Sequence, residues 1–343
     1  MPELIINPFD ENGFDLATMT SAINLIPNTY GRVRQLGIFT PEPITTRTVI
    51  IDEYNGVLTL LKSQPLGAPP PRAKHGKAKT RSFIIPHIPY EDQIKPDDIQ
   101  GVRQWGTGQA ATLERVMLTR LTAMRASHAI TEEHLLMGGV KGVILDADGS
   151  TIYNLFTEFG VSQEEVNFAL TTDTTNVAGK CREVIRIIED NLMGDVMTGV
   201  RCLCDDTFFD SLIGHPEVEK FWLNHVSALQ LAGVGTDPRK GFNFGGITFE
   251  EYRATATDPT TGSARAFIAA GEAHFFPVGT QNTFKVHYAP ANLMETVNTP
   301  GMPMYARQTM DQKGRWIDIY TESNPLPLCR RPKLLVKGTR TSG

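Results

Sequence analysis

Two aspartates near the middle of the chain have the spacing that best fits catalysis. Asp146 and Asp148 follow an apolar run in the segment VILDADGST. In such an arrangement the first carboxylate can attack phosphorus and the second can act as general acid and base, while Mg²⁺ offsets the phosphate charge. A second acidic pair, Asp205 and Asp206, follows the apolar run VRCLC and could supply metal ligands. The sequence therefore contains one candidate site for phosphoryl transfer.

The sequence around this motif favours a turn over a catalytic site. The motif resembles the nucleophile motif of haloacid-dehalogenase-like phosphatases, where it ends a central parallel strand and is followed by a loop and a helix. Here the segment TIYNLF at 151–156 continues as a second strand-like run, and Asp-Gly is a strong hairpin signal. We predict a β-hairpin with its corner at Asp148 and Gly149. A Mg²⁺-dependent phosphatase that uses Asp146 and Asp148 remains the alternative function.

Other reactive side chains form no recognisable site. Cys202 and Cys204 have the wrong spacing for a zinc knuckle and lack a second pair, so small core residues are the better interpretation. The eight histidines contain no HExxH motif, and Gly106 and Gly108 lack the Gly-Lys-Ser/Thr of a phosphate-binding loop. We therefore expect no catalytic residues, no metal and no cofactor.

Composition and charge exclude several classes of protein. The 343 residues are 41% apolar and 21% charged, which suffices for a sizeable core. A net charge of −5 argues against binding nucleic acid through a basic surplus. We find no run of the roughly 20 apolar residues that a membrane helix needs and no signal peptide at the start. The four scattered cysteines favour a reducing compartment.

A predicted β-loop has the most unusual charge distribution in the chain. Strand-like runs flank a segment rich in proline, and between Tyr54 and Tyr90 there is no acidic residue. Five basic residues gather near the predicted tip: Arg72, Lys74, Lys77, Lys79 and Arg81. Such a run is either a solvated surface or a contact with an acidic patch of a neighbour, and composition alone favours the solvated surface. Apolar residues on the loop need cover, which favours contact with other copies.

The remaining pattern predicts a body of mixed helices and strands. Residues 1–47 are predicted to be an extended arm, because prolines interrupt every long element there. Residues 110–137 predict one long amphipathic helix that ends at Gly138 and Gly139. A second helix is predicted at 173–194 and a short strand at 199–206.

The order of these features resembles the lambda-like phage major capsid protein E family over essentially the whole chain. The most specific pieces are LERVMLTRLTAMRASHAI, LLMGGVKGVILDADGSTIYNLFTEFG, VRCLCDDTFFDSLIGHPEVEKFW and ESNPLPLCRRPKLLV. The resemblance implies the α+β tailed-phage major capsid fold. On that mapping the chain has an N-terminal arm at 1–47, an extended β-hairpin E-loop at 48–95, a peripheral domain with a long spine helix at 96–172, an axial α/β domain at 173–294, and return strands of the peripheral domain at 295–343.

The resemblance also implies a function. A member of this family would be a major capsid protein and no enzyme, assembling into hexamers and pentamers that form the icosahedral head shell around double-stranded DNA, without sequence-specific binding. Scaffold and portal proteins are expected partners, a decoration protein is a further candidate, and no membrane is involved. The expected location is the virion, and the host cytoplasm during assembly. The basic loop tip would contact a neighbouring subunit, and Lys62, Lys74 and Lys77 are cross-linking candidates by location alone.

Overall fold

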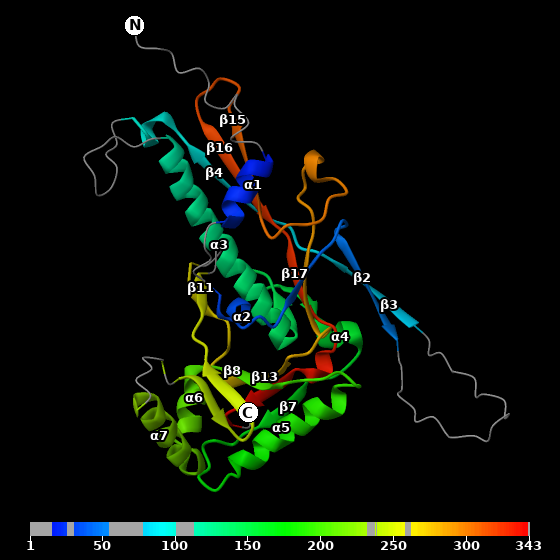
Figure 1. Ribbon diagram of the computed structural model, residues 1–343, viewed down its shortest axis with the longest axis vertical. Helices are drawn as coiled ribbons and strands as arrows, with labels where there is room; N and C mark the ends of the chain where they lie inside the picture. Colours follow the sequence, from blue (N-terminus) through cyan, green and yellow to red (C-terminus); the bar gives the residue numbers. More distant parts are fainter. Residues whose placement is uncertain are drawn as a thin grey trace, which may run out of the picture. The chain divides into compact units, whose positions relative to one another are not determined.

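The computed structural model separates the chain into two compact units, each made of stretches far apart in the sequence (Figure 1). Unit 1 contains Met1–Val49, Phe83–Glu133 and Val286–Leu326, and unit 2 contains Ile50–Ser82, His134–Lys285 and Pro327–Gly343. The structure describes residues 16–25, 31–54, 78–100, 113–231, 237, 239–257 and 262–341. Helices and strands both contribute to each unit, which confirms the predicted α+β class.

Unit 1 is organised by one long helix and an antiparallel sheet. Helix α3 spans Leu113–Lys141, and its residues up to Glu133 belong to this unit. The sheet has the order β15-β16-β4, with strands at Tyr305–Met310, Ile317–Ser323 and Ile88–Ile94. Both pairings are antiparallel. The unit also contains α1 (Leu16–Leu25), α2 (Arg32–Gln35), β1 (Thr40–Pro43), η2 (Pro96–Asp98) and η3 (Met294–Thr296).

An apolar cluster joins helix α1, helix α3 and the sheet of unit 1. On α3, Met117, Leu121 and Met124 recur at spacings of four and three residues, so they lie on one face of the helix. That face is buried with residues from the other elements: Met19, Ile23, Ile94, Met304, Ala306, Ile317 and Ile319. The spacing of the apolar residues therefore accounts for both the helix and the side that it buries.

The predicted extended arm is partly a packed helix. Met19 and Ile23 of α1 are buried in the cluster of unit 1. The Asn24 side-chain amide donates to the Met304 carbonyl at 2.9 Å, and the Thr20 hydroxyl accepts from the Ala306 amide at 3.3 Å. The expectation of an irregular arm is thus wrong for residues 16–25, because the prolines of this region lie outside that stretch.

Helix α3 runs past the two glycines that were predicted to end it. It continues to Lys141, and Gly142, with φ of +80°, follows its last residue. A Cβ on Gly138 would lie 3.0 Å from the Ile144 Cα, so this glycine permits close approach of the next strand. Glycine inside a helix costs only about 1 kcal/mol, which packing offsets here. The predicted end at Gly138 and Gly139 is therefore wrong by one turn.

Unit 2 is a six-stranded mixed sheet with helices. The strand order is β7-β18-β13-β8-β10-β9. Strand β8 lies at the centre, antiparallel to β13 and parallel to β10. The strands span Glu164–Asn167 (β7), Val336–Thr339 (β18), Glu272–Val278 (β13), Gly199–Cys204 (β8), Ile247–Glu251 (β10) and Lys240–Phe244 (β9). Strand β8 confirms the predicted strand at 199–206 as far as Cys204, after which Asp205 caps a helix that begins at Asp206. Strands β7 and β18 extend the sheet outside residues 173–294.

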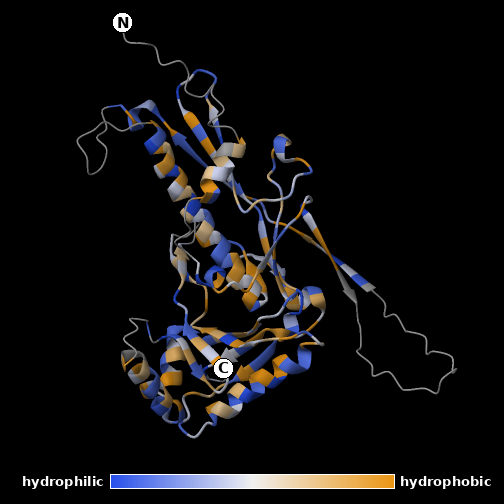
Figure 2. Cartoon of the chain, in the orientation of Figure 1, coloured by the Kyte–Doolittle hydropathy of each residue, from blue (hydrophilic) through white to orange (hydrophobic). Residues whose placement is uncertain are grey.

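Three longer helices accompany this sheet. They are α5 (Val177–Asn191), α6 (Asp206–Ile213) and α7 (Pro216–Leu231). Helix α5 confirms the prediction at 173–194, and Figure 2 shows both hydrophobic and hydrophilic residues along it. Its buried residues Val177, Cys181, Val184 and Ile188 recur at intervals of three and four. Smaller elements are β11 (Thr255–Thr257), β12 (Ala264–Ala266) and η4 (Pro332–Leu334). A separate three-stranded sheet has the order β1-β14-β17, with β14 at Phe284–Tyr288 and β17 at Pro325–Cys329.

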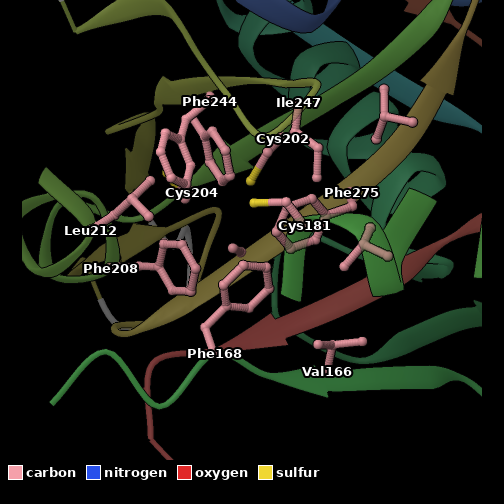
Figure 3. Packing of buried hydrophobic residues seen from close by; sticks show 14 of the residues in the cluster. Val166, Phe168, Cys181, Cys202, Cys204, Phe208, Leu212, Phe244, Ile247 and Phe275 are labelled. Carbon is pink, nitrogen blue, oxygen red and sulfur yellow. The ribbon is translucent and has the colours of Figure 1, made fainter. Parts of the chain in front are cut away.

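The core of unit 2 is rich in phenylalanine and contains three cysteines. The rings of Phe168 and Phe275 stack with centroids 5.3 Å apart. Figure 3 shows the sulfur atoms of Cys181 and Cys202 turned toward each other within this core. Burial raises the pKa of the Cys181 thiol to about 12. The three cysteines are packed as small core residues, as the sequence predicts for Cys202 and Cys204.

Acid should destabilise unit 1 through one buried histidine. His128 on α3 lies with Nδ1 2.8 Å from the Ser323 hydroxyl and Nε2 3.0 Å from the Thr321 hydroxyl. Burial lowers the pKa of His128 to about 4, although the nearby Glu322 carboxylate opposes this shift. The unfolded chain, with a histidine pKa near 6.5, binds the proton more readily. The contribution of His128 to the free energy of unfolding is therefore fully present above about pH 6.5. It is lost as the pH drops toward 4, and the total loss is about 3 kcal/mol.

Urea unfolding of the intact protein and of His128→Gln at pH 7 and pH 4 checks this expectation. The variant should lose about 3 kcal/mol less than the unaltered protein over that interval, because its side chain does not titrate. Equal losses of unfolding free energy in the two proteins would show that His128 does not contribute to the acid sensitivity.

Candidate functional site

The Asp146 and Asp148 motif forms a β-hairpin, as predicted. Strands β5 (Val143–Leu145) and β6 (Thr151–Asn154) pair antiparallel. At the corner, the Gly149 amide donates to the Asp146 carbonyl at 2.9 Å, and Gly149 has φ of +87°, which glycine adopts at little cost. The motif is therefore a turn between neighbouring antiparallel strands, and not the end of a parallel strand as in the phosphatases that it resembles.

The strand predicted to run through residue 156 is shorter than expected. It ends at Asn154, whose side-chain oxygen accepts from the Phe156 amide at 3.0 Å. This contact caps helix α4, Leu155–Phe159. The expectation of a continuous strand over 151–156 is wrong because an asparagine in this position starts a helix.

The acidic side chains of the motif and of the second acidic pair stabilise local structure. The Asp148 carboxylate accepts from the Ser150 amide at 2.8 Å and from its hydroxyl at 2.6 Å, and these bonds lower the pKa of Asp148. Asp205 caps helix α6 by accepting from the Thr207 amide at 3.0 Å. Asp206 pairs with Arg253 at 3.3 Å. Each of these three carboxylates thus has a structural partner.

The geometry does not support the phosphatase alternative. Within the part of the chain that the structure describes, no group of three or more His, Cys, Asp or Glu residues could hold a metal ion. The catalytic interpretation of Asp146 and Asp148 also requires a parallel strand, whereas β5 is one arm of a hairpin. The carboxylates belong to a turn.

The predicted β-loop is built on two paired strands. Strands β2 (Thr48–Tyr54) and β3 (Ala78–Ile84) form a two-stranded sheet. Ile50 and Ile84 are exposed on these strands, whereas their neighbours Ile51 and Phe83 are buried. The alternation follows from the two-residue period of a strand. One face of the strand pair therefore presents apolar side chains that a partner could cover.

The structure describes two of the five basic residues that were assigned to the loop tip. Arg72, Lys74 and Lys77, like the cross-linking candidate Lys62, lie outside the described residues. Lys79 and Arg81 lie in strand β3 instead of at a tip, and Lys79 is exposed. The structure therefore does not bring the five residues together as one described surface.

Arg81 contacts its own chain. Its Nε donates to the Glu158 carbonyl at 2.7 Å, and its Nη2 donates to the Phe159 carbonyl at 3.3 Å. The guanidinium also lies 4.6 Å from the centroid of the Phe159 ring. A cation beside the last carbonyls of a helix and over an aromatic face is favourable. Arg81 thus attaches strand β3 to helix α4, a role that spacing along the sequence could not reveal.

Comparison with known sequences gives one consistent result. The family model described as Phage major capsid protein E matches residues 15–340. A protein named Major capsid protein from Pseudomonas phage KPP10 is 35% identical over 344 residues, covering 96% of this chain and 98% of the relative. A second protein of that name, from Salmonella phage Felix O1, is 29% identical and covers 95% and 96% of the two chains.

Solved structures show the same fold at much lower identity. The putative capsid protein of a prophage of E. coli CFT073 aligns with a TM-score of 0.59 at 13% identity, covering 95% of this chain and 98% of the other. The capsid of Ralstonia phage GP4 aligns with a TM-score of 0.53 at 11% identity, covering 89% and 88%. At such identities the likeness concerns the fold alone.

Proposed function

The chain belongs to the phage major capsid protein E family, and from that premise we propose that it assembles into the hexamers and pentamers of an icosahedral head shell. The family match over residues 15–340 is the observation that carries this proposal. The fold shared with solved capsid proteins supports it. The shell would enclose double-stranded DNA without reading its sequence, and the net charge of −5 would limit adhesion of the DNA to the wall.

The role proposed is structural and not enzymatic. The acidic motif that suggested catalysis forms a hairpin turn, in which the Asp146 carboxylate accepts from the Ala147 amide and the Asp148 carboxylate accepts from the Ser150 amide. Scaffold and portal proteins, and a decoration protein, are proposed partners of the shell. The proposed location is the virion, preceded by the host cytoplasm during assembly. No helix in the described part of the chain is long and apolar enough to cross a membrane.

We retain the proposed division of the chain as a guide to these contacts. Residues 1–47 would be the arm, 48–95 the E-loop, 173–294 the axial domain, and 96–172 with 295–343 the peripheral domain. The paired strands β2 and β3, with an exposed apolar face, support an E-loop that lies on another copy. Because helix α1 is packed in unit 1, only the rest of the arm would be available for contact with neighbouring copies.

Removing four basic charges of the β-loop should weaken the shell. We expect this result from serine at Arg72, Lys74, Lys77 and Lys79 together, with Arg81 kept because it is bonded to helix α4. Exposed ion pairs contribute only about 0 to 1 kcal/mol each, but the loss recurs in every copy of a symmetric shell. Salt should weaken unaltered shells in the same direction, because the screening length falls from ~10 Å at 0.1 M to ~3 Å at 1 M.

Dynamic light scattering over a salt series measures both effects. The fourfold variant should give smaller assemblies at low salt and a flatter response to salt than the unaltered protein. A variant that keeps every charge, Arg72→Lys with Lys74→Arg, Lys77→Arg and Lys79→Arg, is the matched control, and it should preserve both the assembly size and the salt response. Equal assembly size and equal salt response in the fourfold variant would show that the basic run is a solvated loop.

A further inference from the structure

A groove lies in unit 1 between helix α1 and the segment that precedes strand β15. Its volume is about 800 Å³. Apolar and small side chains form much of its lining: Leu16, Ala17, Pro43, Pro300, Met302 and Tyr305. Residues from α1 and from the segment near 300 are brought together by the packing of α1 on β15. The groove is therefore a consequence of the fold of this unit.

The segment that forms one wall of the groove also projects apolar side chains into solvent. Met294 is 90% exposed, Val297 is 59% exposed and Met302 is 48% exposed. This segment, which begins at helix η3, belongs to the orange part of the chain in Figure 1. Exposed apolar residues that adjoin an apolar groove are typical of a surface that another protein covers. Methionine is flexible and polarisable, which suits it to filling a groove of irregular shape.

The charge of this surface restricts what can cover it. Among the described residues that line the groove, the charged ones are Glu295 and Arg307, and they pair with each other at 3.7 Å. The groove has no surplus of opposite charge with which to bind a polyanion or a strongly charged peptide. An apolar centre with a polar edge matches the anatomy of a protein–protein contact. A second copy of the same surface is also apolar and without surplus charge, so two copies can meet there without burying an unpaired charge.

We propose that this groove and the segment Met294–Met302 form a contact between two copies of the chain, in which Met294 of one copy enters the groove of the next. The proposal rests on the proposed function, because a shell places many copies of each surface side by side. It names a contact distinct from the basic β-loop. Since the projection and the groove adjoin each other on one unit, each copy can offer both halves of the contact.

Met294→Asp and Met294→Leu are a matched pair that tests the contact. The side chain is almost fully exposed, so neither change should affect the stability of the unassembled chain. Aspartate would place an unpaired charge in the apolar groove of the next copy, which is costly. We expect the protein concentration needed for shells to rise on the order of tenfold or more in Met294→Asp and to stay unchanged in Met294→Leu. Equal assembly of both variants would overturn the proposal and leave the groove open to another occupant.

A cross-linking experiment identifies the occupant directly. Copies with Met294→Cys are mixed with copies carrying Ala17→Cys, assembled, and treated with a bismaleimide that joins two thiols. The four natural cysteines are buried, so they should not react first. A band with the mass of two chains, present only in the mixture, is expected. Shells that form normally without this band would overturn the inference alone, whereas absence of shells from the unaltered chain would overturn the proposed function.

Discussion

Ile23→Ala is expected to lower the free energy of unfolding by about 2–5 kcal/mol, because it removes a fully buried side chain and leaves a cavity. Ile23 lies on helix α1, in the cluster that joins α1 to α3 and the sheet of unit 1. Leu25→Ala on the same helix is the matched control, since Leu25 is 82% exposed. That change should alter stability by no more than about 0.5 kcal/mol. Urea unfolding of the unassembled chain measures both.

The stabilities of these two variants show whether helix α1 acts within one copy of the chain. If α1 is part of the core, deletion of the first 40 residues removes a stabilising element as well as any contact with other copies. A loss of shells after that deletion would then not isolate the contacts of the arm. Similar stability of Ile23→Ala and Leu25→Ala would contradict the packing of α1, and the region would then act between copies alone.

Glu322→Ala should also be damaging, with an expected loss of about 1–3 kcal/mol. The Glu322 carboxylate is fully buried. It accepts from the Asn292 amide at 2.9 Å, the Asn324 side-chain amide at 2.7 Å and the Tyr320 hydroxyl at 2.9 Å. His87 Nδ1 lies 3.0 Å away. Removing the carboxylate would take this acceptor from the Asn292 amide and the Tyr320 hydroxyl, both partly buried, and would leave the buried Asn324 amide with the Pro290 carbonyl alone. Donors that lose their acceptor in this way cost more than the bonds contribute.

Glu183→Ala provides the comparison for this variant. Glu183 pairs with Lys180 at 2.9 Å, but both side chains are well exposed to solvent. Such a pair contributes only about 0 to 1 kcal/mol. The midpoint of thermal unfolding should therefore be clearly lower for Glu322→Ala than for Glu183→Ala. A Glu322→Ala protein as stable as Glu183→Ala would show that the buried network does not hold the segment near 290 to strand β16.

Local patterns in the sequence predicted several elements correctly. The spacing of Met117, Leu121 and Met124 predicted helix α3, and the Asp148 and Gly149 pair predicted the hairpin. These predictions succeed because side-chain period and turn preference are properties of neighbouring residues. Helix α1 was not predicted, although Met19 and Ile23 are four residues apart, because a helix of 10 residues between prolines gives only a short periodic signal.

Contacts between distant segments could not be predicted. Arg81 bonds to a carbonyl 77 residues away, and no feature of the basic run marks it as different from Lys79. The groove of unit 1 depends on α1 meeting a segment about 280 residues later. Such sites arise from packing, for which a single sequence gives no local signal. The groove therefore became visible only in the folded chain, whereas the charge distribution of the β-loop had already marked that segment as a candidate surface for assembly.

Electron microscopy of the purified, overexpressed protein tests the central claim most directly. A chain that builds a head shell should form closed icosahedral particles of uniform size, because each copy repeats the same contacts around symmetry axes. We expect such particles at low to moderate salt, with hexamers and pentamers resolved in their walls. Monomers or small oligomers alone, under conditions in which the chain is folded, would contradict the claim.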